Sequence, residues 1–352
     1  MKLKKILSLG LVGILTTSLL TACSSSSQGE EQGVLNLYNI GDYINPDLID
    51  EFTEETGIKV IYESYDTNEA MYQKLKSGTN NYDLVFPSDY MVEKLISEEM
   101  IQKIDKEKLT NYEQIGEDFK NPSYDKNEEY SIPYLWGTFG IMYNTSIVTE
   151  TVDSWDMLWN EKYSGQIMML DSMRDSIGIA LKKLGYSMNS TNPDEINLAM
   201  EELKKQKPLI LSYANDEGMD RLIGEDAAMG IAYSGDAVVM MESNPNLAYA
   251  IPKEGTNKWV DTMCIPTQAE NIEEAYAFID FLLRPESAKS NADYIGYAIP
   301  NSGGYEMLDE EQQNNPIMYP SKEDLDKTET FKNITNEELR LYDDAWTEIK
   351  SY

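Results

Sequence analysis

The sequence predicts a two-lobed α/β fold behind an N-terminal export segment, and three observations support this prediction. Short apolar strands alternate with amphipathic helices over about 320 residues, which is enough chain for two domains. The alternation begins again after a change of pattern between residues 131 and 144. After the first 20 residues, no apolar run is long enough to cross a membrane.

The first half of the chain carries clear strand and helix signals. A strand is expected at residues 34–38, and Asn45-Pro46 then opens a helix, with Asn45 as the cap and Pro46 at the first helical position. Gly57 ends that helix. The next expected elements are a strand at 59–62, a helix at 67–75 and a strand at 84–86. Strand–helix–strand units of this length predict a mostly parallel sheet.

The second half repeats this alternation. Two extended pieces are expected around Trp136 and Gly137. They are followed by strands at 166–170, 227–233, 247–251 and 263–265, and by helices at 172–184, from Asn192-Pro193 onward, and at 272–283. The last helix is expected to begin at Thr335, because Glu338 three residues later completes a capping box.

The N-terminus has the pattern of an export signal that ends in a lipidated cysteine. A basic start precedes an apolar run at residues 6–20, and small residues follow it. The motif Leu20-Thr21-Ala22-Cys23, with four serines after it, is similar to the lipobox of bacterial lipoproteins. This similarity implies cleavage before Cys23 and a diacylglyceryl group on that residue. The apolar run is too short for a transmembrane anchor.

Composition excludes several classes of function. The chain has no histidine, which excludes Ser-His-Asp and Cys-His catalysis and His-ligated metal sites. It also predicts that ligand affinity varies little between pH 6 and 8. A formal net charge of -33 argues against a nucleic-acid partner. It would steer a cationic ligand inward, but acidic faces also keep an exported protein soluble, so the charge alone does not identify the ligand. Besides Cys23 the only cysteine is Cys264, so we expect no intrachain disulfide; we also expect no cofactor.

These observations predict the organisation of the chain. A signal segment is expected at 1–22 and a lipidated cysteine with a flexible tether at 23–33. The first lobe is predicted to comprise residues 34–137 and 261–305, and the second residues 138–260 and 306–352. Two α/β lobes behind a lipid tether are typical of the receptor of an ABC importer. Ligands of open α/β sheets bind outside the carboxyl ends of the strands, so we expect an interlobe cleft, with hinges near Gly137 and Asp261.

Aromatic residues and carboxylates stand side by side at the predicted strand ends. Four pairs show this pattern: Asp42 with Tyr43, Asp89 with Tyr90, Tyr233 near Asp236, and Trp259 near Asp261. A buried ammonium group needs carboxylate partners, and aromatic faces attract it further by cation–π interaction. The pattern therefore indicates an alkyl diamine or a polyamine as ligand. Taken singly, each residue fits an ordinary role as helix cap, surface aromatic or core residue, so the prediction rests on the coincidence of the four pairs.

Five segments, at residues 52–62, 101–106, 131–134, 184–187 and 281–285, carry a resemblance to a known family. With them, the chain resembles the spermidine/putrescine-binding receptors of polyamine ABC importers over essentially its whole mature length. The resemblance implies a type II periplasmic-binding-protein fold, a polyamine ligand and ABC permease subunits as partners. It also implies a monomer without enzymatic activity, held at the extracytoplasmic face of the cell membrane.

The resemblance also implies a set of ligand-binding residues. They are Asp42, Tyr43, Ser88, Tyr90, Asp175, Tyr233, Trp259, Asp261 and Tyr297, to which the strand-end pattern adds Asp89, Asp171 and Asp236. Some positions depart from the family: Ile40 replaces a tryptophan and Ser172 a common acidic residue, for which Asp171 is a possible substitute. Lys332 falls where a glutamine is expected, and a lysine there would repel an ammonium group or take its place. These departures leave the choice among spermidine, putrescine and a related amine open.

Two other functions remain open from the sequence. A two-lobed receptor for ferric iron would use paired tyrosinates, and the 24 tyrosines allow this, although alternating aspartates and aromatics fit an organic cation better. A lipid-anchored glycosidase would use two carboxylates across an aromatic-lined cleft. Nothing in the spacing of the carboxylates identifies an acid and a nucleophile.

Overall fold

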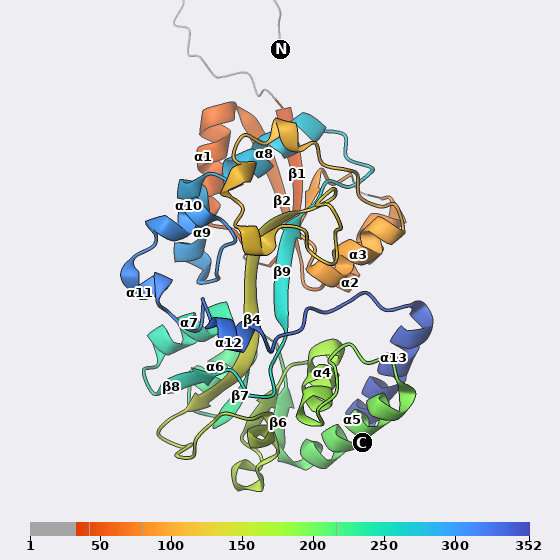
Figure 1. The fold of residues 1–352 in the computed structure, drawn as a ribbon, viewed down its shortest axis with the longest axis vertical. Coiled ribbons are helices and arrows are strands. Elements are labelled where there is room, and N and C mark those ends of the chain that lie inside the picture. Colours follow the sequence, from red (N-terminus) through yellow and green to blue (C-terminus); the bar gives the residue numbers. More distant parts are fainter. Residues whose placement is uncertain (1–32, 42, 80, 216) are drawn as a thin grey trace, which may run out of the picture. The chain divides into compact units, whose positions relative to one another are not determined.

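The computed structural model describes residues 33–41, 43–79, 81–215 and 217–352. It contains two sheets, each with its own apolar core and its own set of helices (Figure 1). The predicted signal segment, Cys23 and the tether up to residue 32 lie outside the described residues, and so does Asp42. The predicted two-lobed α/β fold is confirmed.

The strands of the described chain form one parallel and one mixed sheet. They are β1 (Gly33–Ile40), β2 (Ile58–Tyr65), β3 (Leu84–Val85), β4 (Ile132–Asn144), β5 (Ile167–Met169), β6 (Ile210–Tyr213), β7 (Met229–Tyr233), β8 (Leu247–Ala250) and β9 (Lys258–Met263). The first sheet has the order β2-β1-β3 and is parallel, as predicted. The second has the order β6-β5-β7-β4-β8, and β9 pairs with β4. Because β4 runs antiparallel to β7, β8 and β9, the prediction of a mostly parallel sheet does not hold there.

Helices cover both sheets. They are α1 (Pro46–Thr56), α2 (Asn68–Ser77), α3 (Asp89–Ser97), α4 (Met173–Lys183), α5 (Pro193–Gln206), α6 (Glu217–Ile223), α7 (Ser234–Ser243), α8 (Ile272–Leu282), α9 (Pro285–Ile295), α10 (Ser302–Met307), α11 (Glu310–Gln313), α12 (Lys322–Leu325) and α13 (Asn336–Ser351). Their ends follow the signals in the sequence. The side chain of Asn45 accepts a hydrogen bond at the start of α1, and Gly57 ends it with a φ of 73°. Thr335 and Glu338 form the predicted capping box of α13.

Helices pack on both faces of each sheet. In β1, Leu35 and Leu37 pack into a core with α1 and α8, whereas Tyr38 packs on the opposite face with α2 and α3. In β5, Ile167 packs against α4 and α5, and the neighbouring Met168 packs on the face that α6 and α7 cover. Burial on both faces explains why neighbouring residues of these strands, such as Leu37 and Tyr38 or Ile167 and Met168, are apolar without alternation.

A single long strand passes through both cores. The first part of β4 pairs with β9, and residues 139–144 pair with β7 and β8 (Figure 1). Gly137 does not break the strand, although it suggested two separate pieces in the sequence. A Cβ at this position would lie 2.5 Å from the Ser234 Oγ and 2.6 Å from the Trp259 ring, so the glycine permits a close approach of these residues. The strand predicted at residues 263–265 corresponds to β9, which runs from Lys258 to Met263 because these residues pair with β4.

The chain returns from the first core to the second after α10. Met318 packs beside the first sheet, and Phe331 packs into the core of the second. Between them, the backbone N–H of Glu329 donates to the Thr256 carbonyl at 2.9 Å, and the Lys258 N–H donates to the Glu329 carbonyl at 3.0 Å. The two cores are therefore connected by β4, by β9 and by this returning segment.

Candidate ligand-binding site

Eight of the predicted site residues gather between the two cores. Two lie within strand β9 and one is the last residue of β7. The others follow a strand, begin a helix or follow one, as the strand-end argument predicts. They are Tyr43, Ser88, Asp175, Tyr233, Asp236, Trp259, Asp261 and Tyr297, which we call the Tyr–Asp cluster. Three aspartates of the cluster each accept a hydrogen bond from a tyrosine hydroxyl.

Asp261 is the most fully bonded of these carboxylates. The Tyr43 hydroxyl donates to its Oδ2 at 2.8 Å, and the Ser88 hydroxyl donates to its Oδ1 at 2.5 Å. The residue is only 8% exposed. Burial raises the pKa of Asp261 to about 6, and the two hydroxyl donors oppose that rise. Among the described residues no cation contributes to this shift, so in that part of the chain the carboxylate has two hydrogen-bond donors but no counter-charge.

The other two carboxylates come from the second core. The Tyr233 hydroxyl donates to Asp175 Oδ2 at 2.9 Å. Burial raises the pKa of Asp175 as well. The Tyr297 hydroxyl donates to Asp236 Oδ1 at 2.8 Å, and this bond joins the two cores, because Tyr297 packs in the first and Asp236 lies in the first turn of α7.

A row of aromatic rings connects these carboxylates. The ring centroids of Tyr43 and Tyr297 lie 5.7 Å apart, those of Tyr297 and Trp259 5.2 Å, and those of Trp259 and Tyr233 6.3 Å, all edge to face. The row lies between the aspartates of the two cores. It offers apolar surface between anionic positions, which is what an alkyl chain with charged amino groups requires.

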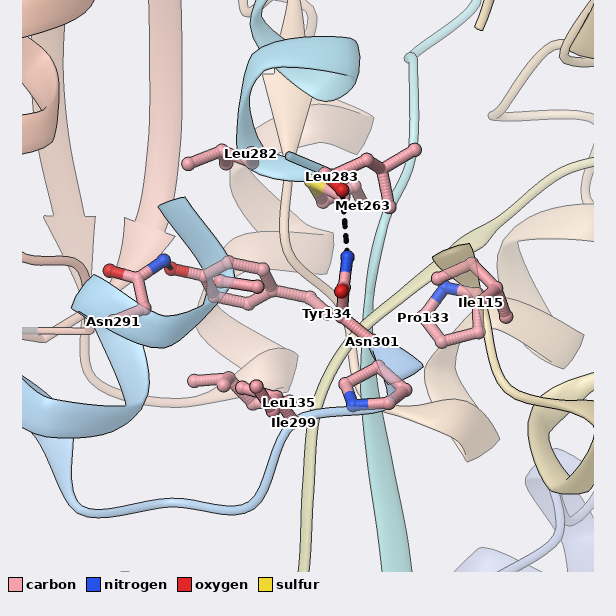
Figure 2. Close-up of a pocket in the computed structure, with 12 residues that line it drawn as sticks. Ile115, Pro133, Tyr134, Leu135, Met263, Leu282, Leu283, Asn291, Ile299 and Asn301 are labelled. Atoms are coloured by element: carbon pink, nitrogen blue, oxygen red, sulfur yellow. Dashed lines mark hydrogen bonds between the residues drawn. The ribbon is translucent and has the colours of Figure 1, made fainter. Parts of the chain in front are cut away.

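The first core fixes the Tyr43 end of this row. The Tyr134 hydroxyl donates to the Tyr43 carbonyl at 2.9 Å and accepts from Asn291 Nδ2 at 3.0 Å. Figure 2 shows Tyr134 and Asn291 beside a small cavity in this core, where Asn301 donates to the Leu283 carbonyl. The cavity measures about 10 Å³, which is room for about one water molecule. It belongs to the packing behind the cluster and is too small to hold an organic ligand.

Asp89 has a different environment from the one that the sequence suggested. Its two oxygens accept the backbone N–H groups of Tyr90 at 2.7 Å and Val260 at 3.1 Å, and the residue is 1% exposed. Burial raises its pKa well above the ordinary value. Because Val260 lies between Trp259 and Asp261, Asp89 holds strand β9 in place and is a positioning residue for both.

Tyr90 lies beside the cluster rather than inside its hydrogen-bond network. Its hydroxyl donates to Glu69 Oε1 at 3.0 Å, and its ring packs against both the first and the second core. Burial raises its pKa well above the ordinary value, and the charges of Glu69 and Asp175 add to that rise.

The structure does not bring Asp171 and the Lys332 side chain into the cluster. Asp171 is exposed and forms an ion pair with Lys350 at 2.7 Å. Ser172, not Asp171, caps α4, since its hydroxyl accepts the Asp175 N–H. Lys332 is exposed too, and its backbone N–H donates to Asn189 Oδ1 at 2.8 Å.

Sequence reasoning missed two residues that shape the site. A Cβ at Gly235 would lie 2.4 Å from the Tyr297 ring, so only glycine permits this contact between the cores. Arg174 influences the pKa values of Asp89, Tyr90 and Asp175. The sequence offers a signal for Gly235, because this residue stands two positions after the end of the strand predicted at 227–233. It offers none for Arg174, whose role depends on tertiary contacts.

Two α/β domains that meet at acidic and aromatic residues define a two-domain binding protein of the periplasmic type. Comparison with family models agrees, because the model of the bacterial extracellular solute-binding protein matches residues 47–320. The chain belongs to this family. In the part of the chain that the structure describes, no helix combines the length and apolarity needed to span a membrane.

Individual relatives are similar over nearly the whole chain. The spermidine/putrescine-binding periplasmic protein of Salmonella typhimurium is 38% identical over 340 residues, which cover 96% of this chain and 97% of the relative. The crystal structure of the spermidine/putrescine substrate-binding protein PotD from Streptococcus pneumoniae is 41% identical, with a TM-score of 0.82; the match covers 91% of this chain and 99% of that chain. A putative spermidine/putrescine transporter protein from Listeria monocytogenes is 38% identical, with a TM-score of 0.87 and the same coverage.

Proposed function

We propose that this protein captures polyamines such as spermidine and putrescine outside the cell membrane and delivers them to an ABC permease. The observation that carries the proposal is the Tyr–Asp cluster, in which buried carboxylates flank a row of aromatic rings. The relatives named for spermidine and putrescine support the same ligand class.

Each part of such a ligand has a partner in the cluster. An ammonium group at Asp261 supplies the counter-charge that this carboxylate lacks, and a buried carboxylate gains most from a charged donor. A second ammonium group binds near Asp175 or Asp236. The methylene chain between them lies against the apolar faces of Trp259 and Tyr297. The same rings attract the flanking ammonium groups by cation–π interaction, which contributes about 0.5–2 kcal/mol per amine.

Capture proceeds by closure of two lobes, one of residues 34–137 and 261–305, the other of residues 138–260 and 306–352, of which the part around Met318 packs beside the first sheet. Strands β4 and β9 connect the two cores, so hinges near Gly137 and Asp261 suit this motion. The protein works as a monomer, a lipid on Cys23 keeps it at the extracytoplasmic membrane face, and it catalyses no reaction. Lys332, with its exposed side chain, is not required for the ligand contacts.

The alternative functions fit the site less well. Ferric iron would need tyrosinates, whereas burial and nearby carboxylates raise the pKa values of Tyr43, Tyr233 and Tyr297 well above their ordinary value. These phenols therefore act as hydrogen-bond donors to the aspartates. A glycosidase is not favoured either, since the relatives are named as binding proteins.

Calorimetric titration of the full-length chain tests the proposal. Spermidine, putrescine, spermine and cadaverine are titrated separately at moderate salt, with ferric citrate as a further ligand. Saturable binding of at least one polyamine, with no binding of iron, is the expected result. Absence of heat with all four amines, confirmed by an unchanged melting temperature, contradicts the proposed function.

A further inference from the structure

We infer that Asn68 is a positioning residue for the Tyr–Asp cluster, and that it makes the Ser88 hydroxyl a hydrogen-bond donor to Asp261. The inference rests on the proposed function, because Asp261 is the carboxylate at which we place an ammonium group of the ligand. Asn68 lies at the start of α2, is 8% exposed, and is linked to the carboxylate through Ser88.

The side-chain amide of Asn68 forms two hydrogen bonds with Ser88. The backbone N–H of Ser88 donates to Asn68 Oδ1 at 3.0 Å, and Asn68 Nδ2 donates to Ser88 Oγ at 2.9 Å. A backbone N–H can only donate, so the amide oxygen must face it and the amide nitrogen must face the hydroxyl. The two partners therefore determine the orientation of this amide.

This orientation decides where the proton of the Ser88 hydroxyl points. Because the hydroxyl accepts a hydrogen bond from Asn68, its own proton is left for another acceptor, and Asp261 Oδ1 lies 2.5 Å away. The backbone keeps the two residues side by side. Ser88 forms an isolated β-bridge with Asp261, and the Thr262 N–H donates to the Pro87 carbonyl at 2.9 Å. The hydroxyl is thus directed at the carboxylate.

Ser88 does not perform the role that its place in the chain suggests. It stands at the N-cap of α3, where a serine hydroxyl usually accepts a backbone N–H of the first helical turn. Its side chain forms no such bond within the described chain. In α2 the cap is Thr67, whose hydroxyl accepts the Ala70 N–H at 3.1 Å, so Asn68 is not needed there as a cap. Both Asn68 and Ser88 are therefore free to act on Asp261.

The donated bond should keep Asp261 ionised at lower pH. A hydrogen bond to the charged form of a carboxylate favours that form, and the Ser88 bond opposes the rise that burial causes in the pKa of Asp261. The other titratable groups whose charges interact with Asp261 are Asp89, Tyr43, Tyr65, Tyr124, Tyr134 and Tyr297. Burial raises the pKa of each of these groups. Asp89 accepts backbone N–H groups, which a change at Asn68 leaves in place.

Asn68→Asp in the full-length chain tests the inference, by calorimetry with putrescine and spermidine between pH 5 and 8. This variant keeps the size of the side chain but offers two acceptors, so the Ser88 hydroxyl should turn towards it and away from Asp261. We expect the pH midpoint of affinity to rise by about one unit. In Ser88→Ala, which lacks the hydroxyl, the same change measures the effect of the new charge alone, and the midpoint should rise by less than about half a unit. The neutral variant Asn68→Ala should raise the midpoint by a smaller amount, and not at all in Ser88→Ala.

Asn244→Ala is the matched control. Asn244 follows α7 and is also 8% exposed. Its Oδ1 accepts the Asn246 N–H and its Nδ2 donates to the Ile223 carbonyl, both at 2.9 Å. It therefore has the same pattern of bonds, at the end of α7 opposite to Asp236. Its loss should lower the melting temperature to a similar degree as Asn68→Ala and leave the pH midpoint of affinity unchanged.

The outcomes separate this inference from the proposed function. Equal shifts with and without the Ser88 hydroxyl would show that only the new charge matters, and the inference would be wrong. An unchanged midpoint in Asn68→Asp with a normal melting temperature leads to the same conclusion. Carbon-13 NMR of the aspartate-labelled, ligand-free protein gives the midpoint of Asp261 directly, with Asp261→Asn for assignment. If the wild type binds neither amine, the proposed function fails, and the NMR titration still decides whether Asn68 acts on Asp261.

Discussion

At the scale of single residues, Asp261 combines two properties that are seldom found together. It is a buried carboxylate with no counter-charge from the residues that the structure describes, yet both its oxygens are hydrogen-bonded by neutral hydroxyls, from Tyr43 and Ser88. Hydroxyl donors fix the position of the carboxylate without cancelling its charge. An incoming cation therefore meets an oriented anion and need not displace a lysine or an arginine.

Asp261→Asn tests whether this charge anchors the ligand. Removing one partner of a buried charge pair costs about 2–5 kcal/mol, so polyamine affinity should fall about 30-fold or more. Asp171→Asn is the matched control, because Asp171 is exposed and paired with Lys350 outside the cluster. Calorimetry should show an affinity within about twofold of the wild type for this control. Equal affinities for both variants would remove Asp261 from the site.

Asp261 also predicts a pH dependence that the absence of histidine alone does not suggest. Its pKa of about 6 means that the carboxylate is ionised at pH 7.5 and becomes protonated as the pH falls through 6. Affinity for an amine should be nearly constant above pH 7 and fall towards about tenfold per pH unit below 6. Calorimetry between pH 8 and 5.5 measures this, and the slope should be much weaker in Asp261→Asn.

Protein stability should not follow the same curve. The folded-state pKa of Asp261 lies above the ordinary value of 3.8, so ionisation of this group opposes folding at neutral pH and acidification removes that cost. Carboxylates with lowered pKa values, such as Glu329, stabilise the fold above about pH 4.5 and lose that effect only in more acidic solution. A melting temperature that drops together with affinity between pH 7 and 5.5 would point to unfolding instead.

At the scale of elements, the contact between α7 and the loop after α9 depends on a glycine. A Cβ at Gly235 would lie 2.4 Å from the Tyr297 ring, although alanine is the better helix former. In Gly235→Ala the added methyl group should push the Tyr297 ring away and separate the two cores at this contact, which lowers polyamine affinity about tenfold or more. The higher helix propensity of alanine should offset part of the lost packing, so the melting temperature of the ligand-free protein should stay within a few degrees of the wild type. Small-angle scattering with saturating ligand should show a larger radius of gyration than for the wild type.

Gly218→Ala provides the control for this change. It lies in α6, where a Cβ would meet its nearest neighbour, the Met168 methyl group, at 3.2 Å. Its affinity and scattering curve should match those of the wild type. If Gly235→Ala closes and binds normally as well, the contact with Tyr297 is not needed for closure.

The elements also show how far the sequence alone can predict this structure. Helix ends that depend on a few neighbouring residues were predicted correctly: Asn45 and Gly57 bound α1, and Thr335 begins α13. Pairing with distant strands decided the rest. Gly137 suggested a break in a strand that pairing with β9 keeps continuous. The strand-end pattern placed both Asp171 and Asp175 among the site residues, but only Asp175 lies in the cluster, whereas Asp171 pairs with Lys350. Strand-end reasoning therefore predicted where the candidate site lies, but tertiary packing determines which residues belong to the Tyr–Asp cluster.

At the scale of the whole molecule, charge and connectivity act on different steps of binding. Three connections join the cores, through β4, β9 and the segment around Glu329, and they would keep the domains together during the closure that we propose. The formal net charge of -33 acts earlier, since it creates a negative potential that reaches beyond the site. Closure should control how long a ligand stays, and the potential should control how fast it arrives.

Because the potential acts on ligand arrival and closure on ligand release, salt should change the association rate constant more than the dissociation rate constant. The Debye length shrinks from about 30 Å at 0.01 M to about 8 Å at 0.15 M salt, so the attraction of a distant cation is screened. The association rate constant of a polyamine should fall about tenfold over this range. The dissociation rate constant should change by less than about threefold, because the buried contacts of the cluster are screened far less than exposed ones. Stopped-flow measurement of tryptophan fluorescence, with Trp259 in the site, gives both constants. A salt effect confined to dissociation would show that the overall charge does not guide the ligand and that local charges alone set the affinity.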